Sequence, residues 1–344
     1  MSIRFICGSF SFLSAPSSQT PFIDSSLHIA HLSAAENIAL EISGMRKTYS
    51  GGVEALKGID LQVPSGCIYG LLGPNGAGKS TLVKILTTLI RASGGTGEML
   101  GRKIGDRSAL KEVGLLPEHA RFPDYLTGRQ VIEFSAGLNE VPSSEVGKRT
   151  NQLLERVGMA EAQNRKIKSY SKGMKQRIGI AQALVNDPKI IFLDEPTDGV
   201  DPAGRRDIQQ LVRELRSEGK TIFINTHILP ELEEVVDRVA IMSHGTLLGE
   251  GPLASLRTTD ITYDVSYQGT LSEATLAPLL KEKVTSQAGK IIITTEQPAE
   301  VQPIIDHLRT QGLIISGVHR KEQSLENLFL GLVAKSAATP PPMK

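Results

Sequence analysis

Residues 68–81 of the chain read IYGLLGPNGAGKST. The opening IYGLL is an apolar run that predicts a buried strand, and residues 82–86 carry apolar side chains at helical spacing. Between the two lies the pattern G-x-x-x-x-G-K-[ST]. Its fixed positions are taken by Gly73, Gly78, Lys79 and Ser80, with a further glycine at Gly76. The stretch therefore predicts a phosphate-binding loop between a strand and a helix.

The residue types in this loop suit the binding of a nucleotide. Glycines allow successive backbone N–H groups to turn toward an anion, and the helix that starts near Gly78 directs its positive end to the same point. Lys79 would reach the β- and γ-phosphates, and the Ser80 hydroxyl would bind Mg²⁺. The candidate nucleotide-binding residues of the loop are Gly73, Pro74, Asn75, Gly76, Ala77, Gly78, Lys79, Ser80 and Thr81.

Three other apolar stretches end at residues that could act on a bound nucleotide. One ends on Asp194 and Glu195, another just before Glu118, and a third just before His227. Carboxylates at the end of a buried strand are costly unless a cation lies beside them. We therefore expect Asp194 to hold Mg²⁺ and Glu195 to polarise the attacking water. The alternative, that both carboxylates lie in a solvated turn, is less favoured. Ligands of open α/β sheets bind beyond the carboxyl ends of the strands, so Glu118 and His227 are expected nearby.

Tyr49 lies upstream of the phosphate-binding loop, in the sequence KTYS. An aromatic side chain at this place could stack on an adenine ring. It could equally be a half-buried tyrosine at the end of a strand. The residues alone leave both interpretations open.

Composition limits the kinds of function that are compatible with the chain. It has 344 residues, a formal net charge of +1 and 22% charged residues, which argues against a nucleic-acid-binding surface. The two cysteines, Cys7 and Cys67, match no metal or redox spacing. The sequence holds no apolar run long enough to cross a membrane, so a role in transport would require a membrane partner.

Composition and the pattern of apolar residues divide the chain into four parts. Residues 1–35 are Ser-rich. We predict that they form a disordered extension or are translated from an upstream start codon, rather than that they form a signal peptide. Residues 36–257 form the predicted ATPase domain. Residues 258–335 alternate between strand and helix patterns and predict a small α+β domain, and residues 336–344 a disordered tail.

Taken together, these motifs resemble the ATP-binding subunit of an ABC transporter. The resemblance covers roughly residues 38–256 and includes Tyr49, the loop, Glu118, the YSKGM stretch at 170–174, the IIFLDE and GVDP stretches, and His227. It implies an α/β fold with a P-loop NTPase core of the ABC-ATPase type, a helical subdomain and an antiparallel β-subdomain. The small α+β domain would be an addition at the C-terminus.

The sequence departs from the family's usual pattern at two places, and these departures point to one subgroup of the family. The family's usual glutamine after the LLP strand is Glu118 here, and the YSKGM stretch stands where LSGGQ is commonest. Ser171 and Gly173, which resemble the family's γ-phosphate contacts, are retained. The variant, with the segment SLENLFL near the C-terminus, looks like the subgroup that drives ABC-2-type exporters.

The resemblance implies a mechanism with two subunits. Ser171 and Gly173 of one subunit would bind the γ-phosphate held by Lys79 of the other, in a homodimer or heterodimer, and Asp201 would communicate across the dimer. His227 would hold the γ-phosphate and the attacking water in register with Glu195. A polytopic permease would dock near residues 118–126, placing the chain peripherally on the cytoplasmic side of the cell membrane.

Competing classes of ATPase or GTPase fit the motifs less well. A GTPase requires N-K-x-D, and no asparagine here is followed by lysine; a small-molecule kinase would not need Ser171. An ABC ATPase that acts on DNA or ribosomes would carry a long coiled coil before Ser171 or a second ATPase domain. The C-terminal domain could bind a regulator, although an extension of the dimer interface is favoured.

Overall fold

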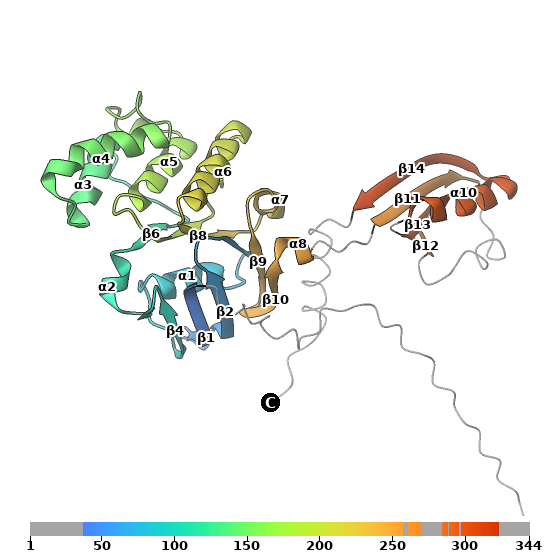
Figure 1. Cartoon of the computed structure of the whole chain (residues 1–344), viewed down its shortest axis with the longest axis horizontal. Coiled ribbons are helices and arrows are strands. Elements are labelled where there is room, and N and C mark those ends of the chain that lie inside the picture. Colours follow the sequence, from blue (N-terminus) through green and yellow to red (C-terminus); the bar gives the residue numbers. More distant parts are fainter. Residues whose placement is uncertain (1–36, 257–260, 270–283, 288, 296, 323–344) are drawn as a thin grey trace, which may run out of the picture.

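The computed structural model describes residues 37–256, 261–269, 284–287, 289–295 and 297–322 (Figure 1). The predicted extension at residues 1–35 and the predicted tail at residues 336–344 lie outside the described residues, as do residues 270–283 and 323–335 of the predicted α+β domain.

A six-stranded sheet with the order β10-β9-β3-β8-β7-β6 forms the centre of the ATPase region (Figure 1). Its neighbours pair in parallel, except for the antiparallel pair β9 and β10. The strands are β3 (Ile68–Leu72), β6 (Val113–Leu116), β7 (Ile190–Asp194), β8 (Thr221–Thr226), β9 (Arg238–Ser243) and β10 (Thr246–Pro252). Every residue of β3, β7 and β8 is buried, as expected for parallel strands covered on both faces.

The register of this sheet aligns the strand ends that carry the candidate site. Leu72 at the end of β3 pairs with Thr226 of β8, and Asp194 at the end of β7 pairs with Asn225 of β8. The phosphate-binding loop after β3, the carboxylates after β7 and the polar end of β8 therefore meet at one edge of the sheet.

A second, antiparallel sheet has the order β2-β1-β4-β5. Its strands are β1 (Ile38–Thr48), β2 (Glu54–Pro64), β4 (Gly94–Met99) and β5 (Arg102–Lys103). Apolar side chains of β1 and β2 share one hydrophobic cluster with β3 and with α1 (Lys79–Leu86). The short helix α2 (Arg107–Leu110) leads back to β6.

A set of helices packs on the other hydrophobic cluster of the central sheet (Figure 1). It contains α3 (Gly128–Leu138), α4 (Ser143–Arg156), the 3₁₀ turn η1 (Ile167–Ser169), α5 (Lys172–Ala183), α6 (Pro202–Ser217), α7 (Leu229–Glu233) and α8 (Leu253–Leu256). Thr127 caps α3 with a capping box, and Ser171 caps α5 by accepting from the Met174 N–H.

The C-terminal residues form a third sheet, with the order β12-β13-β11-β14. Its strands are β11 (Ile261–Gln268), β12 (Val284–Gln287), β13 (Lys290–Thr294) and β14 (Ile314–Glu322), with η2 (Pro298–Glu300) and α10 (Val301–Thr310). Their apolar residues form a hydrophobic cluster of their own. The α/β fold expected from the sequence, with a P-loop NTPase core, a helical part and an antiparallel part, is confirmed; the domain boundaries stay predictions.

Candidate functional site

The phosphate-binding loop is shaped by glycines that approach neighbouring backbone closely. A Cβ at Gly73 would lie 2.5 Å from the Met242 carbonyl oxygen, and a Cβ at Gly78 would lie 2.6 Å from the Ala55 carbonyl oxygen. Gly78 is the N-cap of α1 with φ of +106°, a conformation that favours glycine. The loop thus leads directly into the positive end of α1.

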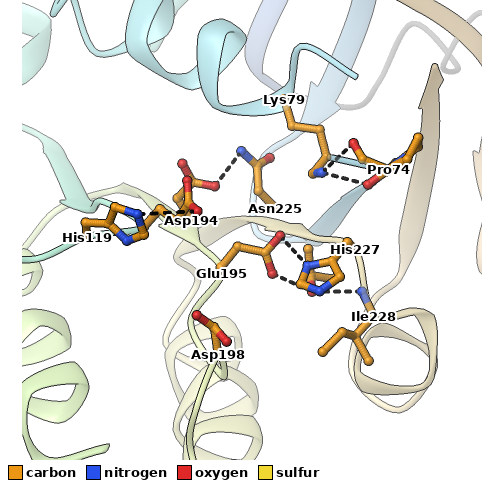
Figure 2. Close-up of polar contacts among 12 residues, drawn as sticks. Pro74, Lys79, His119, Asp194, Glu195, Asp198, Asn225, His227 and Ile228 are labelled. Carbon is orange, nitrogen blue, oxygen red and sulfur yellow. Dashed lines mark hydrogen bonds and ion pairs between the residues drawn. The ribbon is translucent and has the colours of Figure 1, made fainter. Parts of the chain in front are cut away.

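Lys79 lies buried at the start of α1 and points back into the loop. Its Nζ donates to the carbonyl oxygens of Gly73 at 2.6 Å and Pro74 at 3.3 Å (Figure 2). Burial lowers the pKa of Lys79, and the negative charges of Glu195, Asp194 and Glu118 oppose that shift. The ammonium is therefore near the candidate carboxylates, as the strand register requires.

Asp194 ends β7 with a buried carboxylate. Asn225 Nδ2 donates to its Oδ1 at 3.2 Å. Burial raises the pKa of Asp194, the charges of Glu118 and Glu195 add to the rise, and hydrogen bonds from Asn225 and Ser80 oppose it. The carboxylate thus sits beside Ser80 of the phosphate-binding loop.

Glu195 is held in a fixed orientation by three side chains. Its Oε2 accepts from the Thr226 hydroxyl at 3.0 Å, and its Oε1 lies 2.9 Å from His227 Nδ1 (Figure 2). Its carbonyl oxygen accepts from Gln176 Nε2 at 3.1 Å. Its φ of +50° lies in the left-handed region, which is uncommon outside glycine and costs backbone energy. The carboxylate is buried but its imidazole partner is 41% exposed, so His227 connects Glu195 with the open side of the site.

The residues present suit a magnesium ion. The Ser80 hydroxyl and the buried Asp194 carboxylate are hard oxygen ligands, and the two side chains lie within hydrogen-bond reach of each other. Within the described part of the chain, no group of three or more His, Cys, Asp or Glu side chains could hold a metal alone. The donors are of the kind that bind Mg²⁺, which commonly uses one or two protein oxygens together with water and substrate phosphates.

Two other predicted residues lie at the margins of the site. Glu118 follows the end of β6, which stops at Leu116, and its side chain is 46% exposed. Its charge affects the pKa values of both Lys79 and Asp194. Tyr49 follows β1, with its hydroxyl 3.3 Å from Thr81 Oγ1 and Lys47 Nζ 5.2 Å from its ring centre. Tyr49 is thus tied to the phosphate-binding loop, and stacking on adenine stays a prediction.

Ser171, Gly173 and Asp201 lie together in a different place. They line a pocket of about 480 Å³ with Val200 and with residues 158–162. No residue of the phosphate-binding loop lines this pocket, whose region is fully described. One copy of the chain therefore separates its predicted γ-phosphate contacts from Lys79.

Three residues that orient the carboxylates were not expected from the sequence. Thr226 and Gln176 fix Glu195, and Asn225 fixes Asp194. Asn225 and Thr226 are the last two residues of β8 and directly precede His227, so their position in the sequence could have identified them as candidates. The position of Gln176 on the buried face of α5 depends on the packing of that helix against β6, which neighbours β7 in the sheet.

Comparisons with known proteins agree with this geometry. A family model described as ABC transporter matches residues 56–198. An ABC transporter ATP-binding protein of Nostoc sp. is 41% identical over 304 residues, which are 85% of this chain and 89% of that protein. The daunorubicin resistance ATP-binding protein DrrA3 of Streptomyces coeruleorubidus is 33% identical over 303 residues, covering 86% of this chain and 95% of that protein.

Solved structures match the ATPase region. A dimeric ATP-binding cassette in a post-hydrolysis state, bound to ADP and Pi, superimposes with a TM-score of 0.58 at 27% identity, covering 62% of this chain and 98% of that chain. Among the residues that the structure describes, no helix combines the length and the apolar character needed to cross a membrane. ATPase subunits of this kind dimerise and work with membrane permease subunits. The chain belongs to the ABC transporter ATP-binding proteins, and it is an ATPase.

Proposed function

We propose that this chain powers export through a separate membrane permease of the ABC-2 type. In this proposal, ATP binding closes two copies of the chain and hydrolysis separates them. Support comes from the similarity to the daunorubicin resistance protein DrrA3 and from the YSKGM stretch. The chain would lie on the cytoplasmic side of the membrane, with residues 36–257 as the ATPase domain and residues 258–335 as a domain that extends the dimer interface.

The observation that carries the proposal is the division of the ATP site. Lys79, Asp194, Glu195 and His227 meet at the carboxyl edge of the central sheet, whereas the pocket of Ser171 lies elsewhere. The N-terminal end of α5, which Ser171 caps, offers backbone N–H groups and a positive dipole to an anion. A second copy could supply this end to the phosphates bound at Lys79, completing each of two equivalent sites.

The groups around Glu195 suit the activation of water. Thr226 and His227 hold the carboxylate so that it can accept a proton from a water placed in line with the γ-phosphate. The exposed ring of His227 would contact the γ-phosphate, and Lys79 would neutralise charge on the β- and γ-phosphates. Ser80, Asp194 and Glu118 would hold Mg²⁺, which supplies charge neutralisation at the transferred phosphate when bound.

Replacing the catalytic base tests the two-copy mechanism. The Glu195→Gln variant should bind ATP, but its rate of ATP hydrolysis should be about 10²–10⁴-fold lower than that of the unmodified chain, because the amide cannot accept the proton. With ATP it should therefore accumulate as a dimer in light scattering and return to monomer with ADP. The double variant Glu195→Gln with Lys79→Ala serves as control and should stay monomeric. A Glu195→Gln chain that stays monomeric at saturating ATP would contradict the proposal.

A further inference from the structure

Lys172, the residue after Ser171, is bound to the segment that follows the catalytic carboxylate. Its Nζ lies 2.6 Å from Asp198 Oδ2, and the two side chains are 59% and 44% exposed. The hydrogen bond from Lys172 lowers the pKa of Asp198. The ion pair thus joins the first residue of α5 to the residues between Glu195 and Asp201.

Gly199 provides the space for this ion pair. A Cβ at Gly199 would lie 2.4 Å from Cδ of Lys172 and 2.7 Å from its Nζ. Gly199 also has φ of +68°, in the region that favours glycine. The lysine stem therefore lies directly over the backbone of Gly199, and the contact is one of packing as well as charge.

The ion pair spans two regions with different neighbours. Asp198 belongs to residues 195–201. At one end of these residues, Glu195 is held by Thr226, His227 and Gln176. At the other end, Asp201 lines the pocket that it shares with Ser171 and Gly173. Figure 2 shows Asp198 beyond Glu195, on the side away from Lys79. The bond from Lys172 to Asp198 therefore joins the neighbour of Ser171 to a residue three positions before Asp201, and both Ser171 and Asp201 line this pocket.

We propose that the Lys172–Asp198 ion pair is a positioning element that holds Ser171 and Asp201 at the spacing needed to receive the second copy. This inference rests on the proposed function, because the second copy enters only there. The pair contacts neither Lys79 nor the carboxylate of Glu195. Its loss should therefore weaken ATP-dependent dimerisation and raise KM for ATP, with little effect on the binding of ATP to the monomer.

The size of the effect follows from the exposure of the pair. A solvent-exposed ion pair changes an equilibrium by about three-fold. A homodimer contains the pair twice, so its dissociation constant should rise by about ten-fold. High salt should also raise the dissociation constant of the homodimer of the protein with the ion pair intact, because exposed charges are screened.

The experiment uses the full chain with Glu195→Gln as the dimerising parent. Lys172→Met, Asp198→Asn, both together, and the charge exchange Lys172→Asp with Asp198→Lys are each added to this parent. Hydrogen–deuterium exchange without nucleotide reports the segments 171–176 and 198–204, and light scattering with ATP reports dimerisation. Lys148→Met, at an exposed lysine of α4, is the matched control for loss of one positive charge.

The proposal predicts faster exchange in both segments in each single variant, no further change in the double variant, and about ten-fold weaker dimerisation. The charge exchange should restore both readouts in part. Unchanged exchange in the single variants would overturn the proposal, as would faster exchange with undiminished dimerisation. A parent that does not dimerise contradicts the proposed function and the positioning role with it, while the exchange data still show whether the ion pair forms.

Discussion

At the scale of single residues, the candidate site holds opposite charges that burial disfavours. Burial lowers the pKa of Lys79 and raises the pKa of Asp194, so that each charged form is destabilised relative to water. Anionic phosphates would stabilise the ammonium, and a divalent cation would stabilise the carboxylate. The site is thus arranged for binding partners that the isolated chain does not supply.

The pKa of Asp194 leads to a prediction about stability. Because burial raises the native pKa above the unfolded one, the folded chain binds more protons between the two values, and stability falls as pH rises through that window. Asp194→Asn removes the buried charge and should stabilise the nucleotide-free chain at neutral pH by about 1 kcal/mol, or roughly 2–4 °C in Tm. Thermal unfolding should show the difference shrinking as the pH falls, and ATP hydrolysis should be lost.

Asp187 provides a control of opposite sign. Its bond to Lys220 lowers the pKa of Asp187, so it contributes stability above the unfolded pKa that is lost as the pH falls. Its φ of +52° is a conformation that asparagine tolerates. Asp187→Asn should therefore be less stable than the parent at neutral pH and equal to it in acid. If Asp194→Asn also destabilised the chain at neutral pH, the account of its buried charge would be wrong.

The sequence predicted the residues whose chemistry is tied to a local pattern. Lys79 and Ser80 belong to a fixed spacing, and Asp194 and Glu195 end an apolar strand, so their convergence followed from the parallel sheet. Gln176 and Lys172 could not be placed in the same way. Their partners, Glu195 and Asp198, are distant in sequence, and the packing of α5 over the central sheet, next to β6, brings them into contact.

At the scale of elements, α3 contains two glycines in different surroundings. A Cβ at Gly128 would lie 2.4 Å from the Tyr170 hydroxyl, which donates to the Ala162 carbonyl oxygen at 2.7 Å. Gly137, in the last turn, has no atom within 4 Å of the corresponding position. The first glycine therefore serves the packing of α3 against the chain before α5, and the second does not.

This difference predicts opposite effects of the same substitution. Gly128→Ala should destabilise the chain by about 1–3 kcal/mol because the buried Tyr170 must move. Gly137→Ala should stabilise it by about 0.5–1 kcal/mol because alanine is the better helix former. Urea unfolding of the two variants gives both values. Equal effects would show that the contact at Tyr170 does not limit the packing of α3.

Elements with strong periodicity were predicted better than those without it. The apolar strand β3 and the helix after the phosphate-binding loop were predicted from their patterns, and the apolar stretches that end on Asp194 and just before His227 are the strands β7 and β8. The strands β4 and β5 were not expected, because β4 contains three glycines in the sequence GGTGEM and pairs with β1 through its backbone. Glu118, expected at the end of a strand, follows β6 by two residues because the strand stops before Pro117.

At the scale of the whole molecule, the central claim is that two copies share each nucleotide. One copy holds Lys79 and Glu195 at one edge of the central sheet and Ser171 with Asp201 in a separate pocket. The sequence places these residues in the right order along the chain. It cannot show which of them meet within one copy, because that depends on the arrangement of the helices over the sheet.

Mixing two inactive variants tests this claim most directly. Lys79→Ala loses the phosphate contact of its own copy, and Ser171→Ala loses the contact offered to the partner, so each variant alone should hydrolyse ATP very slowly. Circular dichroism before mixing confirms that both are folded. In an equal mixture, mixed dimers contain one complete site, and the rate of ATP hydrolysis should rise toward roughly a quarter of the unmodified rate. A mixture no faster than the mean of the two separate variants would contradict the shared site.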